Sequence, residues 1–184
     1  MEEWIIPILG VAICFTSKIC FMSATVIDGR NLAREIRKEI RKKVKAILKK
    51  GERAPKLAVI MVGDNPASKA YVRNKIRSCE KCKIEHVMHH LDDAVSENEL
   101  LQLVDAINED EGVDGVIVQL PLPDQIDEDK VTLRIKPHKD VDGFHPQNIG
   151  RMALGLPAYI PATPKGILEM LKRYDIETEG KHCV

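Results

Sequence analysis

Between residues 30 and 50, apolar residues recur every three or four positions, which predicts an amphipathic helix. The apolar positions are Leu32, Ile36, Ile40, Val44 and Ile47. Gly51 follows them, and glycine is a common residue at the end of a helix. The opposite face is rich in lysine and arginine, and Glu39 and Lys43 are spaced for a helical ion pair. The pattern therefore predicts one face against a core and one face in solvent.

The chain then alternates between short strand patterns and longer helical ones. A continuous apolar run over residues 57–62 has the length and branching of a buried parallel strand. Further strands are expected over residues 84–90 and 113–120, with helices from Pro66 through Cys79 and from Ser96 to Asn108. This order predicts an α/β fold with a mainly parallel sheet covered on both faces, a three-layer domain.

Capping residues mark the beginnings of these helices. Asn65 suits an N-cap, with Pro66 in the first turn. Ser96 and Glu99 have the spacing of a capping box. Two later helices are expected over residues 127–135 and 164–174. These signals fix the helix starts more firmly than the helix ends.

Composition narrows the class of protein. The 184 residues are 44% hydrophobic, and 28 Lys and Arg balance 28 Asp and Glu. No global field therefore recruits nucleic acid or an acidic membrane surface. The five cysteines are scattered through a chain with enough apolar residues to form a core without disulfides. We therefore expect a cytoplasmic protein that binds no nucleic acid.

The N-terminal residues 1–22 form an apolar extension. An apolar run over residues 4–15 resumes as far as Met22, as in a signal or a membrane anchor. Glu2 and Glu3 stand where a signal peptide carries positive charge, and Pro7 interrupts the run. Two interpretations stay open: an anchor or export segment, or an upstream extension with Met22 as the working start. A membrane partner is not expected.

Polar residues with catalytic potential follow the predicted strands. Tyr71 and Lys75 share one helical face after the first strand, Gln119 follows the third strand, and Asp142 lies in a polar turn. Ligands of α/β sheets bind at the carboxyl ends of the strands. A tyrosine and a lysine at this spacing are more often a surface pair, and an aspartate before glycine is usually a turn residue. Their joint occurrence is what points to a site.

Four segments resemble motifs of one enzyme family. They are residues 71–75 (YVRNK), 118–123 (VQLPLP), 139–144 (KDVDGF) and 161–166 (PATPKG). Their order and spacing are similar to those of the bacterial bifunctional methylenetetrahydrofolate dehydrogenase/methenyltetrahydrofolate cyclohydrolases. The resemblance extends from Val26 to the last residue.

The resemblance implies one-carbon folate chemistry at a single site. The family oxidises 5,10-methylenetetrahydrofolate with NADP and hydrolyses the methenyl product to 10-formyltetrahydrofolate. By resemblance, Lys75 is the general acid and base, Gln119 bonds to it or to the folate, and Tyr71 stacks on a ring of the substrate. Asp142 binds the pterin edge, and Val118 and Leu120 complete the substrate-binding set. A homodimer is also implied.

The same resemblance divides the chain. Residues 23–145 are expected to form the folate-binding catalytic domain, and residues 146–184 to begin an incomplete Rossmann-like NAD(P)-binding domain whose first strand starts near Lys181. The glycine-rich cofactor loop would lie beyond Val184, so no cofactor-binding residue is assigned. Two hypotheses follow: an enzyme sequence shortened at its C-terminus, or a catalytically silent folate-binding or interaction module.

Two further patterns have structural interpretations. Cys79 and Cys82 form a C-x-x-C inside a helix, without a second pair. His86 and His90 share a face of the second strand but have no acidic third ligand at suitable spacing. No metal site is expected.

Overall fold

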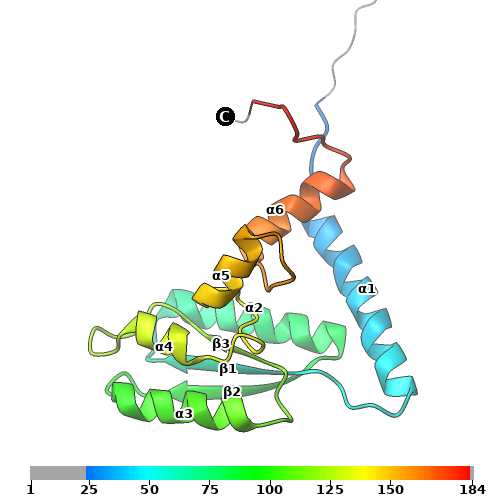
Figure 1. Ribbon diagram of the computed structural model, residues 1–184. Helices are drawn as coiled ribbons and strands as arrows, with labels where there is room; N and C mark the ends of the chain where they lie inside the picture. Colours follow the sequence, from blue (N-terminus) through cyan, green and yellow to red (C-terminus); the bar gives the residue numbers. More distant parts are fainter. Residues whose placement is uncertain (1–23, 183–184) are drawn as a thin grey trace, which may run out of the picture.

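A three-stranded parallel sheet forms the centre of the protein in the computed structural model, which describes residues 24–182 (Figure 1). The sheet has the order β2-β1-β3. The elements are α1 (Gly29–Lys49), β1 (Lys56–Val62), α2 (Pro66–Cys82), β2 (Glu85–Leu91), α3 (Glu97–Glu109), β3 (Gly115–Val118), α4 (Glu128–Arg134), α5 (Pro146–Ala153) and α6 (Ala162–Arg173). The predicted N-terminal extension lies outside the described residues.

Strand β1 lies at the centre of the sheet, and five of its seven residues are buried. Ile60 lies opposite His89 of β2 and opposite Val118 of β3. Ala58, Val59 and Ile60 are fully buried, as a strand covered on both faces requires. The predicted parallel α/β fold is confirmed, and the predicted strand in residues 57–62 matches β1 within one residue.

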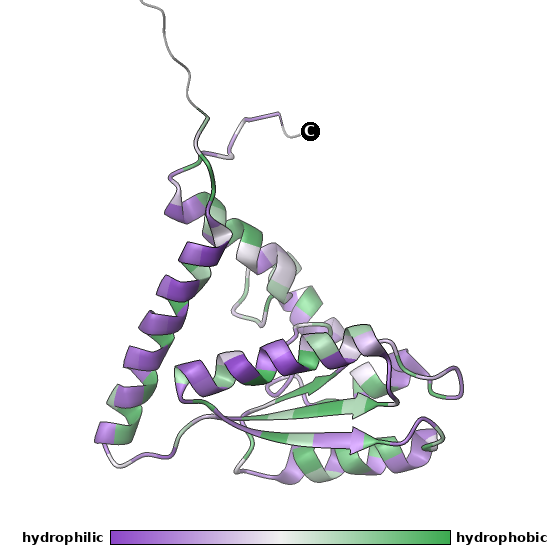
Figure 2. Ribbon diagram, turned by 180° about the vertical axis from the view of Figure 1, so that it is seen from behind, coloured by the Kyte–Doolittle hydropathy of each residue, from purple (hydrophilic) through white to green (hydrophobic). Residues whose placement is uncertain are grey.

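Two cores cover the two faces of the sheet, which gives the predicted three layers. On one face, Ile60 packs with Leu100 and Val104 of α3 and with Val131 of α4. On the other face, Val59 and Met61 pack with Val72 of α2. Figure 1 shows α2 and α3 on opposite sides of the sheet, and Figure 2 shows the hydrophobic residues concentrated in the strands. The face under α2 is the smaller core.

The predicted helix caps are present. The Asn65 side chain accepts from the backbone of Ala67 and Ser68. Ser96 and Glu99 make both bonds of the capping box. Gly51, with φ of 82°, follows the end of α1 in the left-handed conformation that glycine adopts readily. Local chemistry therefore sets these three boundaries.

Some predicted boundaries were wrong. The third strand was expected over residues 113–120 but covers Gly115–Val118. Val113 N bonds within a turn to Asp110 O, and Pro121 has no N–H with which to extend the ladder. Helix α5 was not predicted, because its one buried residue is Asn148 and it has no buried apolar stripe. Of the four residues 181–184 predicted to open a strand, Lys181 and His182 lie in no strand, and the other two lie outside the described residues.

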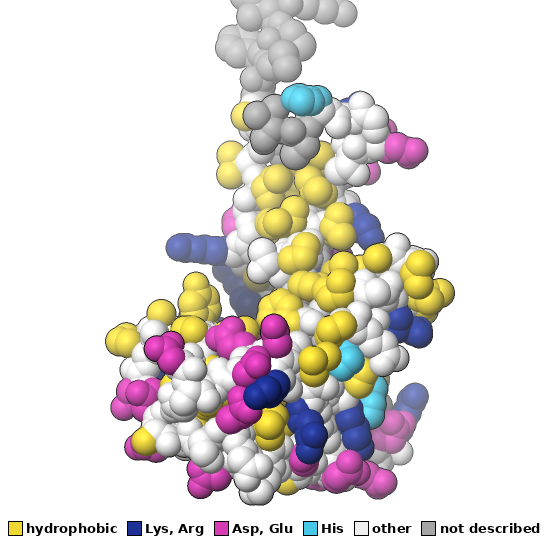
Figure 3. Space-filling view, turned by 60° about the vertical axis from the view of Figure 1, so that its left-hand side comes forward, with side chains coloured by type: hydrophobic (Ala, Val, Ile, Leu, Met, Phe, Trp, Pro, Cys, Tyr) yellow, Lys and Arg dark blue, Asp and Glu magenta, His cyan; other side chains and the backbone are white. Residues whose placement is uncertain are grey.

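Helices α1 and α6 meet at one end of the molecule (Figure 1). The Tyr174 hydroxyl accepts from Asp28 N at 2.7 Å. Arg173 forms an ion pair with Glu39 at 2.8 Å, so Glu39 bonds across to α6 and not, as predicted, to Lys43. Helix α6 has no buried residue. Figure 3 shows hydrophobic side chains gathered where α5 and α6 lie. Ile149 of α5 and Ile167 of α6 are both exposed.

The cysteines of the C-x-x-C pattern are structural. Cys79 and Cys82 are both buried on α2, and the Cys82 thiol lies 3.8 Å from Arg37 O of α1. Burial raises the pKa of both thiols, which keeps them in the unreactive thiol form. Within residues 24–182, no helix is long and apolar enough to cross a membrane.

Candidate active site

Lys75 and Asp142 are brought together from distant parts of the sequence. Lys75 lies on α2, and Asp142 lies in the turn between α4 and α5. Lys75 Nζ is 3.6 Å from Asp142 Oδ2. Their side chains are 32% and 21% exposed, so each is half-buried and still reached by solvent. The pair places one proton donor, Lys75, beside one proton acceptor, Asp142, in a half-buried position.

Burial sets the protonation behaviour of Asp142. It raises the pKa of the Asp142 carboxyl above the ordinary value, because a desolvated carboxylate is disfavoured. The charge of Lys75 lowers this pKa, and the neighbouring Asp140 raises it further. Desolvation is the dominant effect, so the ion pair with Lys75 only partly offsets it.

A buried carboxylate, Asp140, holds the turn that carries Asp142. Its Oδ1 accepts from Gly143 N at 3.0 Å. Its Oδ2 accepts from His145 N at 2.8 Å and from the Asn148 amide at 2.9 Å. Three donors around one carboxylate compensate for its burial. Asp140 therefore joins the turn to the first residues of α5.

Close packing fixes the same turn from the outside. Gly143 has φ of 74°, and a Cβ there would lie 2.9 Å from the backbone of Pro161 and Tyr159. Glycine is the residue that this position accepts. Lys139, only 5% exposed, donates to Ile107 O at 2.8 Å and to Asp110 O at 2.7 Å. The KDVDGF segment is thus bonded on both sides of Asp142.

Gln119 follows directly on β3, at the carboxyl edge of the sheet. Its amide nitrogen donates to Leu120 O at 2.7 Å. Its Oε1 is buried and has no hydrogen-bond partner among the described residues. A buried acceptor without a donor is costly, so this atom is a place where a ligand's N–H or the ammonium of Lys75 would be favoured.

The remaining predicted residues lie around this edge. Tyr71 is one helical turn before Lys75 and is 64% exposed, which leaves its ring free to stack. Val118 and Leu120 line a cavity of about 20 Å³ together with Asp142. That volume holds about one water molecule. A larger ligand would therefore have to lie on the surface beside this edge.

Asp140, Lys139 and Asn148 were not predicted as functional residues, although Asp140 and Lys139 belong to the KDVDGF motif. All three are buried, and the amide of Asn148 also donates to Pro137 O at 2.9 Å. A signal for Asp140 was present, because an aspartate three residues before glycine is typical of a turn closed by its side chain. No comparable signal marked Lys139 or Asn148.

Fold and site together define an α/β domain whose polar residues gather at the carboxyl edge of a parallel sheet, the usual ligand position of such domains. The model of the tetrahydrofolate dehydrogenase/cyclohydrolase catalytic domain matches residues 27–142. The chain therefore belongs to the tetrahydrofolate dehydrogenase/cyclohydrolase family, as its motifs predicted. The matched residues include Tyr71, Lys75, Gln119 and Asp142.

Curated relatives carry the name bifunctional protein FolD. The protein of Azobacteroides pseudotrichonymphae is 51% identical over 160 residues, which are 87% of this chain and 55% of that protein. The protein of Christiangramia forsetii is 50% identical and is 54% covered. The chain thus spans about half the length of the curated relatives it matches.

Solved structures agree with this assignment. The bifunctional enzyme FolD of Campylobacter jejuni superposes with a TM-score of 0.84 at 45% identity, covering 86% of this chain and 56% of that one. The Trypanosoma brucei dehydrogenase-cyclohydrolase, solved with NADP cofactor and an inhibitor, has a TM-score of 0.82 at 33% identity, covering 86% and 54%. The folds of these relatives therefore match the described part of this chain.

Proposed function

We propose that this chain acts in one-carbon folate metabolism and hydrolyses 5,10-methenyltetrahydrofolate at the site of Lys75 and Asp142. The observation that supports this most is the 3.6 Å pair of Lys75 Nζ and Asp142 Oδ2 beside the unpartnered Oε1 of Gln119. The family of the chain, with relatives named as bifunctional FolD proteins, supplies the substrate class.

The reaction needs proton transfer at two atoms. Water adds to the cationic methenyl carbon between N5 and N10 and loses one proton. The hydroxyl group on that carbon then loses its proton as the C=O bond forms, the bond from the carbon to N5 breaks, N5 gains a proton, and the carbon stays on N10 as a formyl group. One proton is released in the net reaction. A single group that accepts and then donates a proton serves both steps, and Lys75 is the residue to which we assign it.

The pairing of Lys75 with Asp142 supports a role for substrate binding in freeing the lysine. The aminopyrimidine edge of a pterin presents N–H donors, and a carboxylate accepts two of them. When Asp142 accepts these bonds, fewer of its lone pairs face the Lys75 ammonium, and the methenyl cation approaches that ammonium at the same time. Both changes favour release of the lysine proton. Gln119 Oε1 then offers an acceptor that orients Lys75 or the folate, and Tyr71 offers a stacking surface.

The dehydrogenase activity of the family is a separate proposal. The whole-length enzymes oxidise 5,10-methylenetetrahydrofolate, and NADP supplies the hydride acceptor. The pattern Gly-x-Gly-x-x-Gly occurs nowhere in these 184 residues, so we find no fit for the cofactor phosphates and assign no residue to NADP. We also propose a cytoplasmic location. We further propose a homodimer, and sedimentation velocity of the purified chain would test that oligomeric state.

The hydrolysis is tested by adding 5,10-methenyltetrahydrofolate to the purified chain and following the loss of its near-ultraviolet absorbance. Lys75→Ala is expected to abolish the protein-dependent rate. Lys81→Ala removes the same charge from an exposed position on the same helix and is expected to leave the rate unchanged. Equal rates for the wild type and Lys75→Ala would refute the role of Lys75.

Binding measured on the same samples separates the two hypotheses for this chain. Fluorescence titration with methenyltetrahydrofolate reports occupancy without turnover. Saturable binding that is weakened by Asp142→Asn, with no hydrolysis, indicates the silent folate-binding module. Absence of both binding and hydrolysis contradicts the proposed function.

A further inference from the structure

A second pocket lies beside α5, and its lining includes neither Lys75 nor Asp142. Its volume is about 500 Å³, within the range of small-molecule sites. Its polar lining residues are His138, Gln147, Asn148, Arg151 and Tyr159. No aspartate or glutamate lines it, and Arg151 gives it a positive charge. The pocket is therefore built for a neutral or negatively charged ligand.

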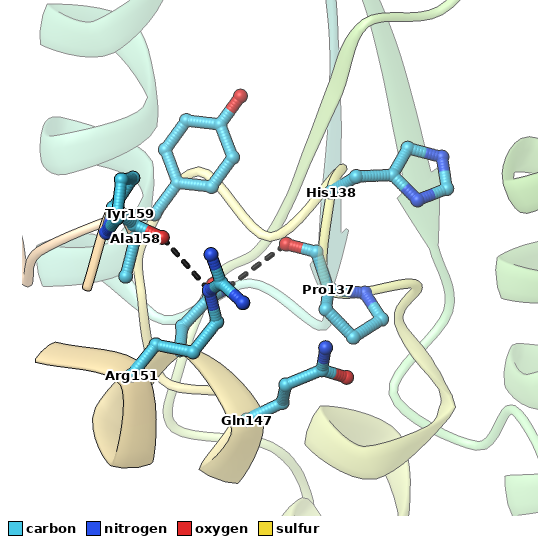
Figure 4. Close-up of a pocket in the computed structure, with 8 residues that line it drawn as sticks. Pro137, His138, Gln147, Arg151, Ala158 and Tyr159 are labelled. Carbon is cyan, nitrogen blue, oxygen red and sulfur yellow. Dashed lines mark hydrogen bonds between the residues drawn. The ribbon is translucent and has the colours of Figure 1, made fainter. Parts of the chain in front are cut away.

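Arg151 is held in place by one of its five N–H groups. Its Nε donates to Pro157 O at 2.8 Å. Among residues 24–182, the terminal nitrogens make no hydrogen bond and Arg151 takes part in no ion pair. Figure 4 shows the guanidinium group between Pro137 and Tyr159. Four N–H groups are thus presented by a guanidinium whose position is already fixed.

A second donor comes from the same helix. Gln147 precedes Arg151 by four residues on α5, so the two side chains share a face. Figure 4 shows the Gln147 and Arg151 side chains both rising from α5, with the Gln147 amide on the side of Pro137. The Asn148 side chain is occupied by Pro137 O and Asp140 Oδ2, which ties the floor of the pocket to the turn. The side-chain donors of Arg151 and Gln147 therefore project from a helix that Asn148 bonds to the neighbouring turn.

We propose that this pocket binds a small molecule bearing an oxyanion, a carboxylate or a phosphate group, between Arg151 and Gln147. A guanidinium matches the geometry of such groups with two parallel N–H bonds. Because the bond from Nε to Pro157 O already orients it, little side-chain entropy is lost on binding. This site contains neither Lys75 nor Asp142, although Asn148 of its lining also bonds to Asp140 in the turn that carries Asp142.

The test is an NMR titration of the full chain at constant ionic strength, with glutarate in one series and inorganic phosphate in the other. Saturable shifts of the Arg151 Nε–Hε and Gln147 side-chain amide signals are expected in at least one series. A response to glutarate alone identifies a carboxylate site, and a response to phosphate alone identifies a phosphate site. Absence of saturable shifts at Arg151 in both series overturns the proposal.

Variants separate the pocket from general charge attraction. Arg151→Gln is expected to weaken binding by about tenfold or more, the cost of losing a charge-assisted pair of bonds. Arg41→Gln removes the same charge from an exposed position on α1 and is expected to change nothing. Equal weakening by both variants overturns the proposal. If Arg151→Gln does not fold, Arg151→Lys replaces it, since lysine keeps the charge but lacks the planar pair of donors.

Discussion

Lys75 Nζ lies 3.6 Å from Asp142 Oδ2, yet the pKa of Asp142 is raised and not lowered. Burial of the carboxyl outweighs the attraction of the lysine, and Asp140 adds repulsion from the other side. The folded chain therefore keeps a carboxylate where its charge reduces stability. Such a position is typical of residues retained for function.

The free energy of unfolding should depend on pH because burial raises the pKa of Asp142. Because the folded-state pKa of Asp142 is raised, the folded chain holds its proton more tightly than the unfolded chain. This favours folding fully below the ordinary aspartate pKa of 3.8, and the contribution is lost as pH rises through the folded-state pKa. Asp142→Asn, which stays neutral, should therefore unfold at higher urea than the wild type at pH 7.

The measurement is urea unfolding of both proteins at several pH values. The advantage of Asp142→Asn should shrink as pH falls toward 4, within the range where free aspartate titrates. Asp124→Asn, at an exposed position of the loop after β3, is the matched control and should show no such trend. An Asp142→Asn variant less stable than the wild type at pH 7 would contradict the dominance of burial.

Much of this site could be predicted from the sequence, and the part that could not has a physical reason. Lys75 follows β1 on a helix with clear caps, so its place at the sheet edge follows from local signals. Asp140 and Asp142 look alike in the sequence. Asp140 turns inward, where it accepts from two backbone N–H groups and from Asn148, a residue of the unpredicted helix α5. Tertiary contacts, and not the motif, therefore distinguish the buried Asp140, which holds the turn, from the half-buried Asp142 of the site.

Asp140 should be more important for stability than any charge of the exposed surface. In Asp140→Asn, one oxygen faces three donors, and the new amide group meets Asn148 or the backbone of His145 or Gly143. Leaving buried donors unpaired costs about 1–3 kcal/mol each. We therefore expect a loss of about 2–4 kcal/mol in the free energy of unfolding, on the same principle. Urea unfolding at pH 7 measures this loss, with Asp124→Asn as the control. A loss equal to that of the control would refute the role of Asp140 in holding the turn.

Substitution of Gln119, unlike that of Asp140, should change stability little and should weaken substrate binding. Its Oε1 is buried without a partner, and Gln119→Met removes this acceptor in a side chain of similar length. The variant also loses the bond to Leu120 O, worth about 1 kcal/mol. The two effects nearly cancel, so we expect the free energy of unfolding to change by less than about 1 kcal/mol.

Binding to Gln119→Met is the decisive measurement. If Oε1 accepts a bond from the folate or from Lys75, titration with methenyltetrahydrofolate should show about tenfold weaker binding or a comparable loss of hydrolysis. Gln125→Met, in the loop after β3, serves as the control because its amide bonds to Asp93 O away from the site. Unchanged binding and unchanged hydrolysis in Gln119→Met would remove Gln119 from the site.

The ion pair of Glu39 with Arg173 should govern how firmly α6 is attached to α1. The two Glu39 oxygens accept from the two terminal nitrogens of Arg173 at 2.8 and 2.9 Å, and these contacts raise the pKa of Arg173 and lower that of Glu39. Both groups are exposed, so salt screens them and global stability should change little. Because α6 has no buried residue, its local opening should respond more strongly.

Hydrogen exchange of the α6 amides should therefore accelerate in Glu39→Gln and in high salt, while α3 stays protected. Lys43→Gln, the partner that the sequence suggested for Glu39, should leave exchange in α6 unchanged; acceleration by Lys43→Gln equal to that by Glu39→Gln would mean that general charge, and not the pair with Arg173, holds the helix.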